Sequence, residues 1–306
     1  MANIIALVWD FDKTLIDGYM QDPIFEDFDV DPHDFWAEVN GAPEKIRQEK
    51  GGNIRVNPDT YFLNVFIKES RKGGRFPGLN NEKLREYGKK QKFYPGVLEF
   101  FKETKNMFTS DSAYSQWGIQ VENYIVSTGF AEVIRGSAIM PYVDDVWGCE
   151  VLDEVGDDDE LELSETVYTI DNTSKTRALF EINKGIGQID SIDVNSQIPR
   201  EARRVQFQNM IYIADGPSDI PAFSVVNQNG GSTFAIYPHG DEKALKQVEE
   251  MRASGRIQMF AEADYSEGTT ANLWIRNKIK ERADAIRTRE NDRIAASASG
   301  VPHHLV

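Results

Sequence analysis

The sequence predicts an α/β protein: a Rossmann-like, mostly parallel sheet with helices on both faces, plus an inserted α-helical cap. Short apolar runs alternate with helical patterns along the chain, which is typical of parallel strands joined by helices. Three of these runs stop abruptly at polar residues. Residues 17–90, directly after the first run, show only helical periodicity and turn residues. We therefore assign residues 1–16 and 91–306 to the core domain and residues 17–90 to the cap.

Composition excludes several classes of protein. The chain has 34 Lys and Arg against 50 Asp and Glu, a net charge of −16. This balance argues against nucleic acid or an anionic membrane as the partner, because phosphate groups select positive surfaces. Cys149 is the only cysteine, so neither an internal disulfide nor a zinc ribbon can form. No apolar stretch reaches the ~20 residues of a membrane helix, and the N-terminus lacks the basic start of a signal peptide. We expect a soluble, cytoplasmic protein.

The first strand is predicted over residues 4–9, where a run rich in Ile and Val stops at Asp10. The cap follows. Asn57-Pro58-Asp59 opens one cap helix, because asparagine caps helices and proline suits the first turn, and Gly73-Gly74 ends it. Asn81 caps a further helix.

The rest of the core alternates strands with helices. Pro95 begins a helix, and the second buried strand, residues 124–126, ends at Ser127-Thr128-Gly129. The acidic run 156–160 separates two strand-like segments and predicts a hairpin with a solvated tip. An irregular polar stretch covers residues 187–204. The remaining elements expected are helix 174–184, strand 210–214, helix 218–227, strand 233–237, helix 241–254, strand 257–260 and helix 269–293.

Three of the polar strand ends are predicted to meet. They are Asp10-Phe11-Asp12-Lys13-Thr14, Ser127-Thr128-Gly129 and Asp215-Gly216-Pro217-Ser218-Asp219. In open parallel sheets, ligands bind at the carboxyl edge of the strands, and helix N-termini there direct amides at an anion. The three segments are therefore expected to line one crevice.

Asp10, Asp12 and Asp215 would bring three carboxylates into this crevice. Such crowding is unfavourable unless a cation is present, and oxygen ligands of this kind suit Mg²⁺. The competing interpretation is that each aspartate merely caps the helix that follows it. That interpretation accounts for any one of them singly but not for the three together.

A lysine is also expected at this edge. Lys175 lies in the first turn of the helix opened by Asn172-Thr173-Ser174, where the helix dipole disfavours a cation. A nearby anion explains a lysine there better than helix stability does. Lys184, in the last turn of the same helix, is the alternative, but the dipole alone accounts for that position.

These residues resemble the haloacid dehalogenase superfamily, in particular its phosphatases with a helical cap, of the phosphoserine phosphatase type. The resemblance spans residues 4 to 237, with about 40 residues between Lys175 and Asp215. The matching segments, in order, are Ala6-Leu7-Val8-Trp9-Asp10-Phe11-Asp12-Lys13-Thr14, Tyr124-Ile125-Val126-Ser127, Lys175, and Asp215-Gly216-Pro217-Ser218-Asp219.

The resemblance implies roles for these positions. Asp10 would attack phosphorus and form an aspartyl-phosphate. Asp12 would protonate the leaving oxygen and then activate water. Mg²⁺ would be held by Asp10, the backbone carbonyl of Asp12, and Asp215, with Asp219 in support. The phosphoryl oxygens would be bound by Ser127, Thr128 and Lys175, and Thr14 and Gly216 would support the site.

The expected function is Mg²⁺-dependent hydrolysis of a small phosphomonoester, a small phosphorylated metabolite. Asp12 favours phosphate-ester hydrolysis over dehalogenation, because an alkoxide leaving group needs a proton and a halide does not. Two alternatives stay open: a phosphotransferase or phosphomutase using the same intermediate, and a non-catalytic protein that binds a phosphorylated metabolite. The sequence identifies neither the substrate nor the oligomeric state.

Overall fold

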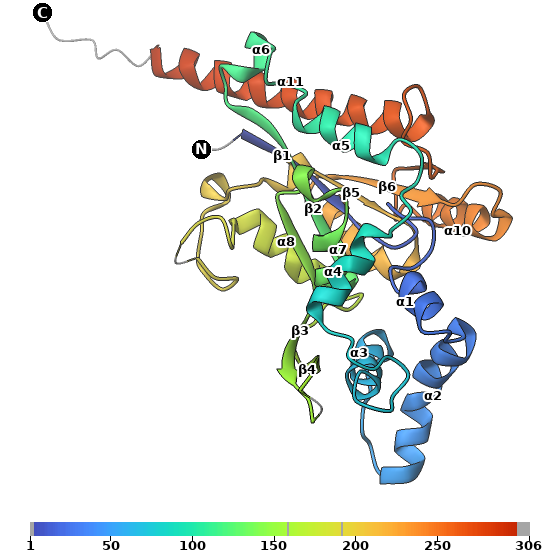
Figure 1. The fold of residues 1–306 in the computed structure, drawn as a ribbon. Helices are drawn as coiled ribbons and strands as arrows, with labels where there is room; N and C mark the ends of the chain where they lie inside the picture. The colour runs from blue at the N-terminus through green and yellow to red at the C-terminus, as the bar shows by residue number, and fades with distance from the viewer. Residues whose placement is uncertain (1–2, 158, 191, 299–306) are drawn as a thin grey trace, which may run out of the picture.

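The computed structural model describes residues 3–157, 159–190 and 192–298, and its centre is a seven-stranded sheet (Figure 1). The strand order is β4-β3-β2-β1-β5-β6-β7, and every neighbouring pair is parallel except β3 with β4. The strands are β1 (Asn3–Trp9), β2 (Ile119–Phe130), β3 (Asp145–Val155), β4 (Leu161–Tyr168), β5 (Met210–Ala214), β6 (Ser232–Tyr237) and β7 (Met259–Glu262). The predicted fold class is confirmed.

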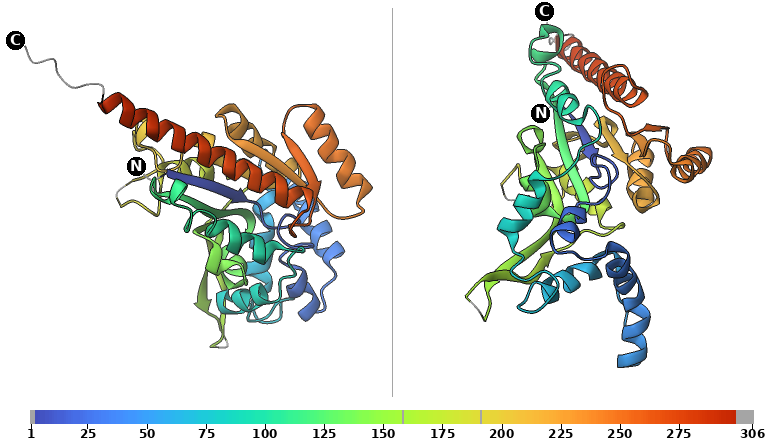
Figure 2. Two further views of the ribbon diagram at one scale, coloured as in Figure 1. Left: turned by 90° about the horizontal axis from the view of Figure 1, so that it is seen from above. Right: turned by 45° about the vertical axis from the view of Figure 1, so that its right-hand side comes forward.

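The helices cover both faces of the sheet, as a parallel sheet requires. In chain order they are α1 (Asp22–Asp27), α2 (Pro32–Lys50), α3 (Pro58–Glu69), α4 (Asn81–Lys89), α5 (Val97–Lys105), α6 (Ser112–Ser115), α7 (Ala131–Gly136), α8 (Lys175–Lys184), α9 (Ile220–Gln228), α10 (Glu242–Ala253) and α11 (Thr270–Ala298). Residues of α5 and α11 pack on one face, and those of α8, α9 and α10 on the other. The long helix α11 extends along its face in Figure 2.

β1 lies at the centre of the sheet, and this position decides where the chemistry can occur. All seven of its residues are buried, with β2 on one side and β5 on the other. Strand order runs outward in opposite directions from β1, so the carboxyl end of β1 is a switch point of the topology. Ligands in open α/β sheets bind at such points. Asp10 is the first residue beyond this end.

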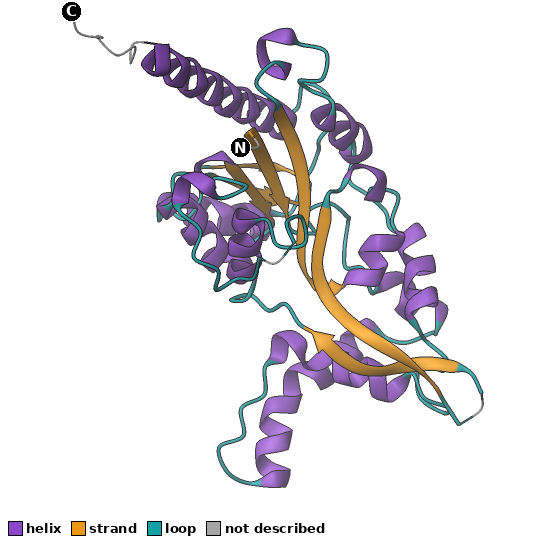
Figure 3. Cartoon of the chain, turned by 90° about the vertical axis from the view of Figure 1, so that its left-hand side faces the viewer, coloured by secondary structure: helices purple, strands orange, loops and turns teal. Residues whose placement is uncertain are grey.

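The segment that contains α1 to α4 lies beyond the carboxyl edge of the sheet and contacts the β3–β4 hairpin, whose strands reach away from the rest of the sheet (Figure 3). The hydroxyl of Ser70 and the carbonyl of Leu79 both bond the backbone of Leu163 in β4. The apolar core is continuous here, since Phe35 and Phe66 belong to the same buried cluster as Leu7. The hairpin predicted around residues 156–160 is present, while the domain boundaries at 16/17 and 90/91 stay a prediction.

Two strands extend differently from the sequence-based expectation. β2 does not end at Ser127-Thr128-Gly129 but continues to Phe130, which pairs with Cys149 of β3 after a shift of register. Polar residues and a glycine mimic a strand end in the sequence, whereas the neighbouring β3 supplies the pairing that prolongs the strand. β7 begins two residues later than expected. None of the helices among the described residues combines the length and apolarity needed to cross a bilayer.

A close contact between α4 and α7 gives a test of this packing. A Cβ at Gly88 of α4 would lie 2.2 Å from the carbonyl oxygen of Val133, whereas one at Gly41 of α2 would meet nothing within 4 Å. We expect Gly88→Ala to lower the free energy of unfolding by about 1–3 kcal/mol, because backbone must move. Gly41→Ala is the matched control and is expected to raise it by up to about 1 kcal/mol through helix propensity. Urea denaturation measures both, and equal effects would contradict the packing described.

Candidate functional site

Asp10 is held in place directly beyond β1. Its backbone N–H donates to the carbonyl of Ile213 in β5 at 2.9 Å, which continues the sheet by one residue. The residue is 6% exposed, and the Thr14 hydroxyl donates to its Oδ2 at 3.4 Å. The loop that carries Thr14 is itself fastened, because the hydroxyl of Tyr265 donates to the Thr14 carbonyl at 2.8 Å. The carboxylate is therefore buried and fixed at the switch point of the sheet.

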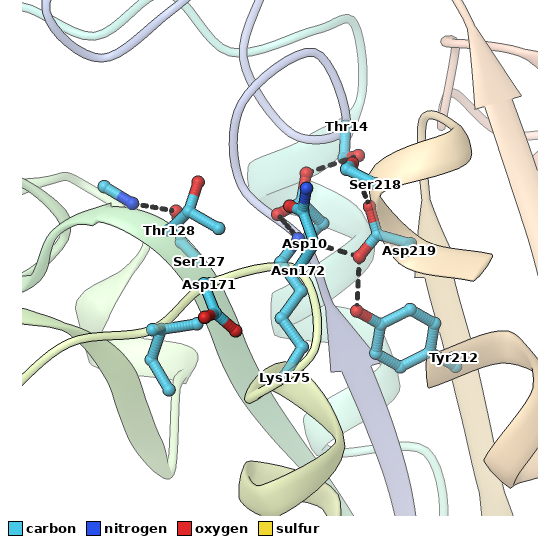
Figure 4. Close-up of polar contacts among 12 residues, drawn as sticks. Asp10, Thr14, Ser127, Thr128, Asp171, Asn172, Lys175, Tyr212, Ser218 and Asp219 are labelled. Carbon is cyan, nitrogen blue, oxygen red and sulfur yellow. Dashed lines mark hydrogen bonds and ion pairs between the residues drawn. The ribbon is translucent and has the colours of Figure 1, made fainter. Parts of the chain in front are cut away.

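Lys175, the first residue of α8, joins Asp10 to Asp219 (Figure 4). Its Nζ lies 2.7 Å from Oδ1 of Asp10 and 2.7 Å from Oδ1 of Asp219, and the side chain is only 2% exposed. A buried ammonium needs partners of opposite charge, and it has two. Lys184 is directed elsewhere, since its Nζ donates to the backbone carbonyls of Val194 and Ser196. The lysine at the carboxyl edge of the sheet is thus Lys175.

Asp219 follows β5 across a short 3-10 turn, Pro217–Asp219. It occupies the N-cap position of α9, but its side chain makes no capping hydrogen bond. Instead the Tyr212 hydroxyl donates to its Oδ1 at 2.6 Å and the Ser218 hydroxyl donates to its Oδ2 at 2.8 Å. The interpretation that such aspartates merely cap helices therefore does not account for Asp219.

Asp215 completes a set of three acids. Asp10, Asp215 and Asp219 each offer a carboxylate oxygen, and these oxygens lie within 4.8 Å of one another. The Asp215 carboxylate finds no hydrogen-bond partner within residues 3–157, 159–190 and 192–298. Three hard oxygen donors with one unengaged carboxylate fit a small divalent cation such as Mg²⁺. These three acids could therefore hold a metal ion, and that the ion is Mg²⁺ stays a prediction.

Burial and the closeness of the three acids raise the pKa values of Asp10 and Asp215. Burial raises the pKa of Asp10 to about 6; Lys175 opposes the rise and Asp219 adds to it. Burial and the carboxylates of Asp10 and Asp219 raise the pKa of Asp215 to about 7. Burial disfavours the charged form of Lys175, but Asp10 and Asp219 outweigh it and hold the lysine pKa above its ordinary value. One ammonium does not neutralise three acids, so the site favours additional positive charge.

Asp12 is not part of this set of carboxylates, although the sequence pattern groups it with Asp10 and Asp215. The chain turns at Lys13, whose φ is 54°, and Oδ1 of Asp12 accepts a hydrogen bond from the backbone N–H of Met20 at 2.8 Å. The side chain of Asp12 is thereby drawn away, and Asp219 takes its place among the three acids. Asp12 is half-buried, and burial together with the Asp10 charge raises its pKa well above the ordinary value. A proton is therefore more readily held there than on an ordinary aspartate.

Ser127 and Thr128 lie on β2 beside this site (Figure 4). The last β1–β2 pair is Trp9 with Ile125, so Ser127 and Asp10 both lie just beyond the paired part of the two strands. Ser127 is buried and its hydroxyl accepts a hydrogen bond from the N–H of Gly129 at 3.1 Å. No hydrogen bond joins either side chain to the acids within the described residues.

Two further residues adjoin the acids. Gly216 has extended backbone, and a Cβ there would meet only the flexible end of Gln247, at 2.9 Å, so the close packing of this glycine constrains the site weakly. Tyr212 orients Asp219 through its hydroxyl, a role that the sequence pattern does not predict. It lies within the apolar run of β5, and from the sequence a tyrosine at such a position predicts only a buried side chain.

The buried ion pairs of Lys175 predict a large effect on stability. We expect Lys175→Met to lower the free energy of unfolding by about 3–5 kcal/mol, because Asp10 and Asp219 would be left buried without a counter-charge. Lys184→Met is the matched control from the same helix and should cost about 1 kcal/mol, the scale of ordinary hydrogen bonds. Guanidinium denaturation measures both. Equal losses would contradict the buried bridge.

Known proteins resemble the chain to different degrees. No family model matches it. An uncharacterised protein of Borreliella burgdorferi is 39% identical over 294 residues, which cover 90% of this chain and 97% of that protein. A solved HAD-family hydrolase from Salmonella enterica has a TM-score of 0.49 at 14% identity, covering 85% of this chain and 67% of its own. A phosphoserine phosphatase solved as a phospho-aspartyl intermediate analogue has a TM-score of 0.48 at 17% identity, covering 84% and 93%.

The identity with the Borreliella burgdorferi protein extends along nearly the whole of both chains. The motifs that follow β1 and β5, the Ser127-Thr128 segment within β2, and the lysine that opens α8 lie in the expected order around one edge of the parallel sheet. The chain therefore belongs to the family of the Borreliella burgdorferi protein.

Proposed function

We propose that the chain is a Mg²⁺-dependent phosphatase that hydrolyses a small phosphorylated metabolite through an aspartyl-phosphate on Asp10. The observation that supports this most is the buried Asp10 carboxylate, fixed at the switch point and bridged by Lys175 to Asp219. A carboxylate so placed is oriented for attack, and the Lys175 ammonium beside it supplies positive charge for a phosphoryl group. We place the activity in the cytoplasm.

In the proposed first step a carboxylate oxygen of Asp10 attacks phosphorus. The new O–P bond forms as the ester O–P bond breaks, and Asp12 passes its proton to the departing alkoxide. The raised pKa of Asp12 suits this role, because the acid must carry a proton near neutral pH. In the second step Asp12 takes a proton from water, the water oxygen attacks phosphorus, and the bond to Asp10 breaks. Inorganic phosphate leaves and both aspartates return to their initial forms.

The other residues neutralise and orient charge. Lys175 would bind a phosphoryl oxygen while it holds Asp10, and Ser127 and Thr128 would add donors from β2. Asp10, Asp215 and the backbone carbonyl of Asp12 would hold Mg²⁺, with Asp219 in support. The bound ion would supply positive charge opposite the transferred phosphoryl group.

Hydrolysis of 4-nitrophenyl phosphate tests the proposal. We expect turnover in the presence of Mg²⁺ and its loss in EDTA, because three crowded carboxylates repel an anionic substrate when the cation is absent. Released 4-nitrophenol and free phosphate are measured together, with and without an added alcohol. Equal amounts under both conditions indicate a phosphatase, whereas a deficit of phosphate with alcohol indicates a phosphotransferase. Absence of turnover with Mg²⁺ across a panel of phosphomonoesters would contradict both.

A further inference from the structure

A cavity opens at the edge of the sheet opposite Asp10. It has a volume of about 500 Å³, and its walls include Asn3 at the start of β1, residues 206–209 before β5, and the C-terminal half of α11. Residues 192–204 lie on the same side of the molecule (Figure 2), and Arg200, Glu201 and Arg203 contribute to the wall. Since β1 has seven residues, this cavity lies roughly 20 Å from Asp10, at the far end of the same strand. It is therefore separate from the catalytic edge.

The cavity is basic in a chain whose net charge is −16. The charged residues that line it are Arg200, Arg203, Arg289, Arg293, Glu201 and Glu290. Glu290 forms ion pairs with two of the arginines, at 3.8 Å from Arg289 and 3.1 Å from Arg293. Glu201 is exposed. Four guanidinium groups therefore face two carboxylates, and a positive excess stays uncompensated.

Two of the arginines have no carboxylate partner within the part of the chain that the structure describes. Arg203 is nonetheless fixed, since its Nε donates to the carbonyl of Ile198 at 3.2 Å and its Nη1 donates to Oδ1 of Asn183 at 3.0 Å. Arg200 makes one long contact, 3.4 Å, to Oδ1 of Asn229. A guanidinium held by neutral partners keeps its full charge for a ligand, and its planar fork matches a phosphate group.

We propose that this cavity binds a small phosphate-bearing molecule, at a site distinct from the catalytic one. The volume suits a metabolite-sized ligand. Asn183, Asn209 and Asn229 also line the wall, but their amides already donate to backbone carbonyls. The arginines are therefore the groups that would bind the phosphate. Arg200 and Arg203 belong to the region between Lys175 and Asp215, and neither side chain takes part in the catalytic site. The inference holds whether or not the chain is a phosphatase.

Calorimetric titration of the full chain with inorganic pyrophosphate in EDTA tests the site. Without a divalent cation the acids around Asp10 repel the probe, so binding reports the cavity. We expect Arg200→Gln with Arg293→Gln to weaken binding roughly 10-fold or more, because two charge-assisted contacts are lost. A second variant, Gln208→Glu, places a carboxylate at an exposed lining position and should also weaken binding while removing no described contact.

The matched control is Arg276→Gln with Arg287→Gln, which removes the same amount of charge at two positions of α11 that do not line the cavity. It should bind as tightly as the unaltered chain, apart from a small loss from overall charge. Thermal melting shows whether each variant is folded. The proposal is overturned if the unaltered chain does not bind pyrophosphate at millimolar concentration, or if the cavity variants and the control bind it equally.

Discussion

Asp10→Asn is expected to abolish the hydrolysis of 4-nitrophenyl phosphate, with kcat reduced on the order of 10⁴-fold or more, the scale seen when a covalent nucleophile is removed. The amide has nearly the shape of the carboxylate, and its oxygen can still accept from Lys175. What it lacks is the negative oxygen that attacks phosphorus. The loss should therefore appear in kcat far more than in the melting temperature. Steady-state kinetics and thermal melting on the same samples measure the two.

The control for this variant is Asp34→Asn, which makes the same chemical change on α2 at a side chain that is 84% exposed. Its turnover should equal that of the unaltered chain. Acid quenching of the unaltered enzyme during turnover, followed by mass spectrometry, should show one added phosphoryl group on the peptide that contains Asp10. Undiminished turnover in Asp10→Asn would exclude the covalent mechanism.

Asp12→Asn is expected to slow turnover by roughly 10²-fold or more, the usual contribution of general acid–base catalysis. Asparagine cannot donate the proton that an alkoxide needs, yet it can keep the hydrogen bond from Met20 that holds the loop. The defect should thus depend on the leaving group. We expect a smaller loss with 4-nitrophenyl phosphate, whose leaving group departs without help, than with an alkyl phosphate.

The measurement is the ratio of kcat values for the two substrates, compared between the unaltered chain and the variant. A ratio that does not change on substitution would show that Asp12 is not the acid for the leaving group. A fall in kcat for both substrates together with a fall in melting temperature would instead assign Asp12 to maintaining the loop.

Much of the catalytic edge can be predicted from local pattern. An apolar run that stops at an acid marks the carboxyl end of a buried strand, and Asp10 and Asp215 do directly follow β1 and β5. Helix polarity favours Lys175 over Lys184, and the structure places Lys175 against Asp10 while Lys184 donates to the backbone of residues 194 and 196. Each of these inferences depends on neighbours within about one turn or one strand, where sequence pattern is informative.

Other features depend on contacts between distant segments. β2 continues through Ser127-Thr128-Gly129 because β3 pairs with it there, which the sequence of β2 does not reveal. Asp219 replaces Asp12 among the three acids because Met20 holds the side chain of Asp12. Tyr212, buried in β5, is recognisable as a partner of Asp219 only once the turn after that strand is in place.

The sequence by itself determined the α/β class, the strand that presents Asp10, and the order of the motifs, because burial and turn chemistry are encoded locally. The tertiary structure decided which oxygens meet, which lysine bridges them, and that residues 192–204 help to form a basic cavity at the opposite edge. Those outcomes depend on strand register and on how loops fold back over the sheet. Interactions across 165 residues, such as Lys175 with Asp10, are settled by that packing.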